Sequence, residues 1–83
     1  MERGEMDACR KAFVKIQNGD WNGAHNIVQD LSSPLASRMH GLLHWQEGDL
    51  FNARYWYRVS GTTFPSGTIE EEVESIGMEI SLD

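Results

Sequence analysis

The sequence predicts an all-α fold in which two antiparallel helical hairpins are closed by a C-terminal helix. Apolar residues recur every three or four positions in five separate stretches, which is the period of an amphipathic helix. Glycine, aspartate, serine, threonine or proline marks each break between these stretches. No stretch alternates apolar and polar residues convincingly, as a half-buried strand would. The 83 residues are therefore expected to form a single helical domain, 1–83.

The first hairpin is predicted to consist of helices over residues 4–18 and 20–31. Between them, "NGDW" supplies Gly19 as a left-handed helix end and Asp20 as the N-cap of the next helix. The apolar stripes of these two helices are Met6, Cys9, Phe13 and Ile16, followed by Trp21, Ala24, Val28 and Leu31.

The second hairpin is predicted to consist of helices over residues 34–47 and 49–60. "SSPL" places Ser33 at an N-cap and Pro34 at the first helical position, where the missing N–H is not needed. "EGDL" repeats the turn of the first hairpin with Gly48 and Asp49. The apolar stripes are Leu35, Met39, Leu42 and Leu43, followed by Leu50, Ala53, Trp56 and Tyr57.

A linker, "SGTTFPSG" (60–67), precedes an acidic C-terminal helix predicted over 68–81, within the segment 68–82. Thr68 and Glu71 have the spacing of a capping box. The apolar residues of this last helix are Ile69, Val73, Ile76 and Ile80. We expect them to cover a second apolar side of the helix over 49–60. The alternative is that this second side stays exposed as a patch of residues typical of interfaces. Its residues are Phe51, Tyr55 and Val59, with Arg58 beside them.

Charge is unevenly distributed along the chain, whose net charge is −6. Residues 1–58 contain seven acidic and seven basic residues, and the last 25 contain six acidic residues and no basic one. Phosphate backbones need a cationic surface, so nucleic-acid binding is disfavoured. An ion pair between Arg54 or Arg58 and the acidic helix is expected, and Asp49 or Glu47 is expected to accept a hydrogen bond from a tyrosine.

Targeting and redox signals are few. The charged start "MERGEMDACR" does not resemble a signal peptide, and no apolar run approaches the roughly 20 residues that span a bilayer. Cys9 is the only cysteine, which excludes an intrachain disulfide and favours a reducing compartment. A cytoplasmic protein without membrane contact is therefore expected.

An internal repeat appears when the chain is shifted by 29 residues, which places "QNGDWNGAHNIV" over "QEGDLFNARYWY". The repeat-like units are 5–32 and 34–61, each a helix, a Gly-Asp turn and a second helix. With this turn and an alanine early in the second helix, the chain resembles tetratricopeptide repeats, although their period is about 34 residues. The resemblance implies a paired-helix stack with a capping helix. The pattern H-x3-H-x2-EGD-x2-NA-x-YWYR also resembles short uncharacterised bacterial proteins, and that likeness implies no activity.

Three histidines form the main candidate for chemistry. At 100° per residue, His40, His44 and Glu47 share one stripe of their helix, on the side away from its leucines. His25, on the neighbouring helix, borders the Trp21 stripe and is placed to face them. Imidazoles four residues apart can chelate zinc, and a His–Glu pair can act as a general acid and base. The plainer interpretation is that these histidines are structural or exposed.

The function favoured by the sequence is a non-catalytic protein-interaction module that needs no cofactor. Its partner would be a protein or peptide, or a second copy in a homodimer. A polar groove would draw on the helices over 4–18 and 34–47, including Lys11 and Lys15. The expected binding residues are His40, His44, Glu47, Phe51, Tyr55 and Arg58.

The alternative function is a small metal- or histidine-dependent enzyme. It would use His40, His44 and Glu47 for catalysis and His25, His40 and His44 for zinc. Convergence of the imidazoles in space is the feature that separates the two functions.

Overall fold

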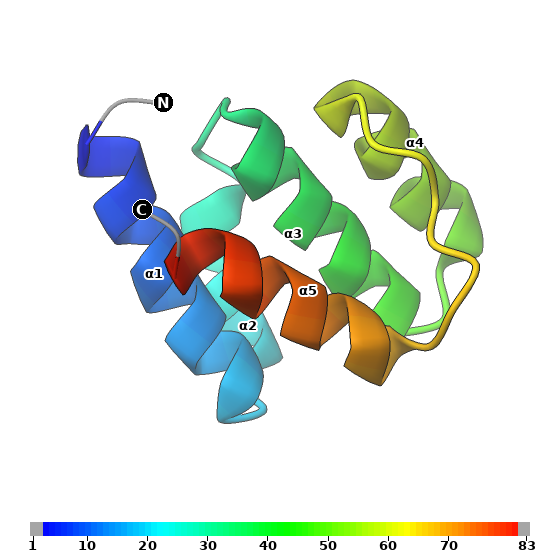
Figure 1. Cartoon of the computed structure of the whole chain (residues 1–83), viewed down its shortest axis with the longest axis horizontal. Helices are drawn as coiled ribbons and strands as arrows, with labels where there is room; N and C mark the ends of the chain where they lie inside the picture. The colour runs from blue at the N-terminus through cyan, green and yellow to red at the C-terminus, as the bar shows by residue number, and fades with distance from the viewer. Residues whose placement is uncertain (1–2, 82–83) are drawn as a thin grey trace.

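The computed structural model describes residues 3–81, and this range contains five helices and no strand (Figure 1). The all-α prediction is therefore confirmed. In chain order, the helices are α1 (Arg3–Gln17), α2 (Trp21–Val28), α3 (Pro34–Gln46), α4 (Leu50–Ser60) and α5 (Ile69–Ser81). None of these helices is long and apolar enough to cross a bilayer.

Two nearly identical turns build the hairpins α1–α2 and α3–α4. Gly19 and Gly48 have φ of 76° and 83°, a left-handed conformation that favours glycine. The next residues, Asp20 and Asp49, accept a hydrogen bond from the backbone N–H three positions on, at Gly23 and Asn52. Both predicted caps are thus confirmed, and each satisfies an N–H that would otherwise lack a partner at a helix start.

The end of α2 differs from the prediction. The helix stops at Val28, whereas the apolar period predicted that it continues to residue 31. Leu31 N–H donates to Val28 O in a tight turn, and Ser33 is extended, with ψ of 154°, as the residue before a proline prefers. The segment that joins the two hairpins therefore ends at Ser33, and α3 begins at Pro34. Ser33 accepts a hydrogen bond from the N–H of Ala36, as predicted for an N-cap.

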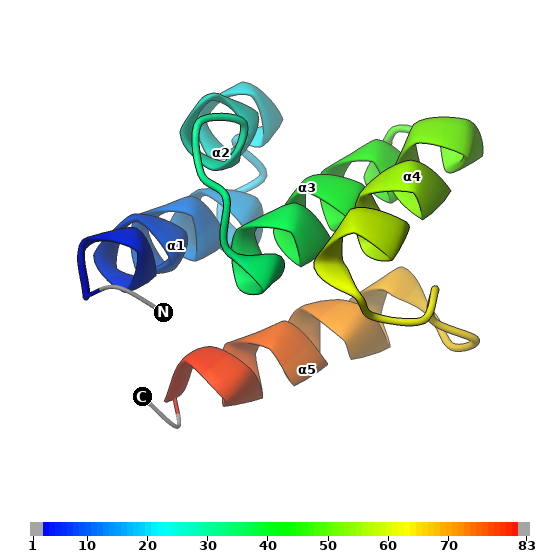
Figure 2. The ribbon, with the colours of Figure 1, turned by 90° about the horizontal axis from the view of Figure 1, so that it is seen from above.

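The central element is α3, which packs against each of the other four helices. α2 and α4 lie on one side of it, and α5 lies on the opposite side, where it also contacts α1 (Figure 2). The largest fully buried side chains include Tyr57, Met39, Leu42, Leu43 and Ile76. Burial of this kind contributes roughly 1.5–3 kcal/mol for each large apolar side chain.

α3 and α4 approach each other closely at Gly41. A Cβ added to Gly41 would lie 2.5 Å from the ring of Tyr57 and 3.0 Å from the carbonyl oxygen of Ala53. Only glycine leaves room for this contact. The ring of Tyr57 is consequently clamped between α3 and the linker, where it meets Phe64 at a centroid distance of 5.2 Å.

The prediction that the C-terminal helix covers the second apolar side of α4 is wrong. α5 packs against α3 and α1, where Ile76 and Ile80 are buried, and it meets α4 through the hydrogen bond from Tyr57 to Glu72 on the inner side of α4. The linker residue Phe64 covers the inner side of α4 instead, beside Tyr57 and under Arg54. The outer side of α4 stays exposed.

The predicted partners of the acidic helix are also wrong. Arg38 of α3 holds Glu72 with two hydrogen bonds of 2.7 and 2.9 Å and reaches Glu79 at 3.1 Å. Tyr57 donates to the same Glu72 at 2.8 Å, rather than to Asp49 or Glu47. α5 packs on α3, so an arginine of α3, and not the predicted Arg54 or Arg58 of α4, forms the ion pair with the acidic helix.

Candidate functional site

The three histidines converge. His25 of α2 meets His40 and His44 of α3, with ring centroids 4.7 and 5.5 Å apart, and His40 and His44 stack at 5.0 Å. One potential ligand nitrogen from each ring lies within 4.8 Å of the other two. The site therefore combines donors from two helices that belong to different hairpins.

Helix geometry places two of these side chains and packing places the third. His40 and His44 are one turn apart on α3, so they project from the same face. The indole N–H of Trp21, the first residue of α2, donates to the backbone carbonyl of Leu43 at 2.7 Å. This bond ties the start of α2 to α3 and sets His25, one turn beyond Trp21, opposite the two histidines.

Two tryptophans pack against the histidine rings of the site. Trp56 of α4 stacks on His40 at 3.9 Å with an interplanar angle of 10°, and Trp21 stacks on His25 at 4.8 Å and 9°. Neither tryptophan is among the site residues predicted from the sequence. The i, i+4 spacing of Trp21 and His25 was an available signal, whereas no sequence signal pairs Trp56 with His40. The stacked rings restrict the imidazoles to few orientations, which favours a preorganised set of donors.

A carboxylate fixes the orientation of His44. Its Nδ1 lies 2.6 Å from Glu47 Oε2, a distance that indicates a strong hydrogen bond. When Nδ1 carries the proton and donates to Glu47, Nε2 keeps its lone pair and is free to bind a ligand. Glu47 thus occupies the position that a carboxylate takes behind a metal-bound histidine in many metalloproteins.

A second group of possible metal ligands consists of His44, Glu47 and Asp49, so it has His44 in common with the three-histidine group. Asp49 is already occupied, because it accepts hydrogen bonds from the backbone N–H and the side-chain amide of Asn52. Those bonds lower the pKa of its carboxyl group. Its structural task is to cap α4, so the three-histidine set is the better candidate for an ion.

The two histidines that face each other are held neutral. Burial lowers the pKa of His40 to about 4, and the neighbouring His25 and His44 act in the same direction. Burial also lowers the pKa of His25, with His44 adding to the effect and Glu47 opposing it. Neutral imidazole is the form that binds a metal ion, so neither of these two ligands has to lose a proton at pH 7.

The donor nitrogens are accessible. Within residues 3–81, no protein hydrogen bond reaches a ring nitrogen of His25 or His40, while His44 bonds to Glu47. Every fully buried polar side-chain atom of the described residues does have a partner. The free nitrogens of His40 therefore keep contact with solvent, although only 5% of the residue is exposed.

Three imidazoles are a known ligand set for zinc. Zinc binds histidine nitrogen at about 2.0–2.1 Å, so nitrogens around one tetrahedral ion are roughly 3.3 Å apart. The three ring nitrogens, which lie within 4.8 Å of one another, must therefore come about 1.5 Å closer to share such an ion. Nitrogen donors favour zinc, copper, nickel or iron over magnesium or calcium.

The neutral state of His40 predicts how the metal-free fold responds to acid. An unfolded histidine takes up a proton near pH 6.5, whereas folded His40 resists protonation until about pH 4. The stability due to this difference is complete above pH 6.5 and is lost as the pH falls from 6.5 to 4. We expect a loss of about 2–4 kcal/mol in the free energy of unfolding, measured by urea denaturation with chelator present.

The matched control for this pH profile is His40→Phe, which keeps a ring against Trp56 and cannot titrate. Carboxyl groups titrate in both proteins, so the difference between the two profiles isolates His40. Parallel profiles over this pH range would show that His40 is not held neutral.

The remaining predicted binding residues lie elsewhere. Lys11 and Lys15 line a separate surface hollow with Val14, Asn18 and Ile27, between α1 and α2. Phe51, Tyr55 and Arg58 are exposed on α4. The structure thus brings together His40, His44 and Glu47 but does not join them to the other residues of the expected groove. Cys9 is fully buried, and burial raises the pKa of its thiol, as expected for inert packing.

Comparisons with known proteins add no relative. No family model matches the chain, and neither curated proteins nor solved structures include a significant match. The likeness to tetratricopeptide repeats therefore stays a prediction from the sequence.

Proposed function

We propose that this protein binds a divalent transition-metal ion, with zinc as the best match, through His25, His40 and His44. The observation that carries the proposal is the convergence of the three imidazoles, each with a donor nitrogen within 4.8 Å of the others. The sequence ranked this function below an interaction module, and convergence is the feature on which that ranking depended.

The surroundings of the three rings support the same proposal. His25 and His40 are in the neutral form that metals bind, and Glu47 leaves one nitrogen of His44 free. Trp21 and Trp56 hold two of the rings by stacking, so little side-chain entropy is lost when an ion is bound. Histidines that only pack in a core do not require neutral rings, a free ring nitrogen and stacked tryptophans in combination.

The number of ligands favours a reactive centre over a purely structural one. Structural zinc sites are usually closed by four protein ligands, whereas catalytic sites keep three and leave one position to water or substrate. Zinc in such a site lowers the pKa of bound water toward neutrality. We therefore propose a metal-dependent enzyme or a metal-responsive protein, with Glu47 positioning His44.

Metal titration tests this proposal directly. Protein stripped with chelator is expected to take up one equivalent of Zn²⁺ in calorimetry, and Co²⁺ is expected to give the visible absorption of a tetrahedral site. Free zinc at about a hundred times Kd stabilises the fold by about 2.7 kcal/mol. For a domain of this size, that corresponds to a rise in Tm of roughly 10–20 °C.

Mg²⁺ is the control ion for these measurements, because it prefers oxygen ligands and should leave Tm unchanged. A protein that shows neither saturable zinc uptake nor a change in Tm with chelator would exclude the proposal.

A second function, the interaction module favoured by the sequence, is supported by a different observation. Phe51 is 84% exposed, and Tyr55 and Val59 of the same helix are 47% and 50% exposed. Aromatic residues and arginine are enriched at protein interfaces, and an exposed row of this kind is typical of a binding surface. We therefore propose that the outer face of α4 docks a protein partner, independently of the metal.

A further inference from the structure

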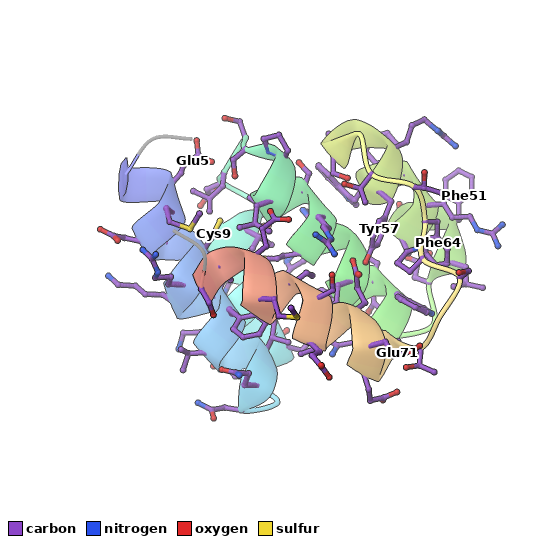
Figure 3. All side chains as sticks on the ribbon, in the orientation of Figure 1. Glu5, Cys9, Phe51, Tyr57, Phe64 and Glu71 are labelled. Carbon is purple, nitrogen blue, oxygen red and sulfur yellow. The ribbon has the colours of Figure 1, made fainter. Side chains whose placement is uncertain are left out.

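The outer face of α4 has no partner among residues 3–81, the part of the chain that the structure describes. Among the helices, α4 packs against α3, and its inner side also reaches α5 through the hydrogen bond from Tyr57 to Glu72. Phe51, Tyr55 and Val59 follow one another at intervals of four residues, so they form one apolar row along the side away from α3. Figure 3 shows Phe51 projecting from the edge of the molecule, whereas Tyr57 of the same helix lies on the inner side. We call this row and the arginines beside it the α4 face.

The charge on the α4 face is positive. Arg54 and Arg58 are exposed, and α4 itself contains no acidic residue. Neither arginine forms an ion pair with another residue of the described part of the chain. The guanidinium group of Arg54 lies over the ring of Phe64 instead. A partner that covers the α4 face must therefore offer apolar area and negative charge together.

The outer side of α5 offers both. Glu70, Glu71 and Glu74 are exposed there, no basic residue occurs in α5, and Met78 is 63% exposed. Glu71, Glu74, Ser75 and Met78 line a surface hollow of about 320 Å³. A hollow with a thioether and carboxylates at its rim can receive an aromatic side chain that is flanked by cations. We call these residues the α5 face.

Within one molecule the two faces do not meet, because α5 packs by its inner side on α3 and α1. We propose that they meet between molecules: Phe51 of one copy enters the α5 hollow of a second copy, and the arginines of the α4 face pair with the glutamates of the α5 face. This inference rests on the second proposed function, the use of α4 as a docking surface, and does not depend on metal binding.

The contact joins two different surfaces, so its geometry has consequences for assembly. A two-fold axis that makes the contact twice gives a closed dimer, and any other operator gives rings or chains. In each case the charged contacts contribute to association, so added salt is expected to weaken it.

Sedimentation equilibrium over a hundredfold range of concentration tests the proposal. The wild-type protein is expected to increase in mass with concentration, and Phe51→Ser is expected to lower the association constant by at least about tenfold. Charge reversal on either face, as R54E/R58E or as E70R/E74R, is expected to have a similar effect. Glu71 is left unchanged because it caps α5 through Thr68.

Mixing the two charge-reversed proteins is the decisive measurement. The acidic α4 face of one then matches the basic α5 face of the other, so a mixture of R54E/R58E with E70R/E74R is expected to associate although neither does alone. The matched control is K11E/K15E, which reverses two charges on α1 and should leave association unchanged. Circular dichroism confirms that each variant is folded.

The remaining outcomes overturn the proposal. A wild-type protein that stays monomeric over the whole range shows that no second copy uses the α4 face, and the metal titration is unaffected by that result. Association that is lost with Phe51→Ser but is insensitive to E70R/E74R shows that α4 meets another surface, such as its own copy. Charge-reversed proteins that stay monomeric when mixed exclude the α4–α5 pairing.

Discussion

Zinc affinity is expected to fall by about a thousandfold or more when His40 is replaced by phenylalanine, because one of three ligands is lost. His40 is the ring shared by the whole site: it stacks on His44 and Trp56 and meets His25 edge-on. Phenylalanine preserves the stacking on Trp56 and removes only the donor nitrogens. The effect should therefore appear in the zinc titration, while the fold seen by circular dichroism is unchanged.

The zinc affinities of further variants test which residues bind the ion and which only position a ligand. His25→Phe and His44→Phe are expected to act like His40→Phe. Glu47→Gln keeps the shape of the side chain and weakens the bond to His44, so a smaller loss of roughly 10- to 100-fold is expected. Glu74→Gln, on the exposed side of α5, is the matched control and should change nothing. Equal zinc affinity in wild type and His40→Phe would show that the ion is bound elsewhere.

The largest effect on stability is expected from Glu72→Ala, at about 3–5 kcal/mol in the free energy of unfolding. Glu72 is 6% exposed and accepts two hydrogen bonds from Arg38 and one from Tyr57. Its removal leaves a guanidinium group that is 12% exposed without its main counter-charge, and a buried hydroxyl without an acceptor. Small domains have only about 0.05–0.15 kcal/mol of stability per residue, so much of the total is at risk.

Urea denaturation of three variants tests this explanation. Glu79→Gln removes the exposed partner of the same arginine and should cost less than about 1 kcal/mol. In the double variant Arg38→Met with Glu72→Leu, no buried charge is left unpaired, so most of the lost stability should return. A Glu72→Ala protein as stable as Glu79→Gln would show that this ion pair does not hold α5 in place.

Much of the fold follows from interactions within a few residues of the chain. Four of the five helices, α2 to α5, begin at caps that the sequence names: Asp20, Ser33, Asp49 and Thr68 each accept a hydrogen bond from the N–H three positions along the chain. Gly19 and Gly48 reverse the chain because a left-handed residue is needed there. Such local signals are independent of the rest of the protein, which is why they could be predicted.

The position of α5 could not be predicted in the same way. Its apolar stripe required a partner, and the exposed row of α4 was as suitable by composition as the face offered by α3 and α1. Arg38 decided between them, because its buried guanidinium needs Glu72 more than the exposed Arg54 or Arg58 needs any acid. The penalty for an unpaired charge depends on burial, and burial is a property of the packed structure.

The sequence by itself determined the helical period, the two Gly-Asp turns, and the placement of His40 and His44 on one stripe of α3, with Glu47 just past the end of that helix. The sequence placed His25 to face that stripe, but only the tertiary structure decided that its ring meets those of His40 and His44. The tertiary structure also decided that Trp21 and Trp56 flank the site and that the row through Phe51 stays exposed. The physical reason is range. Caps and helix periods act over a few residues, whereas the side chains that meet across α2, α3 and α4 are set by how the helices pack.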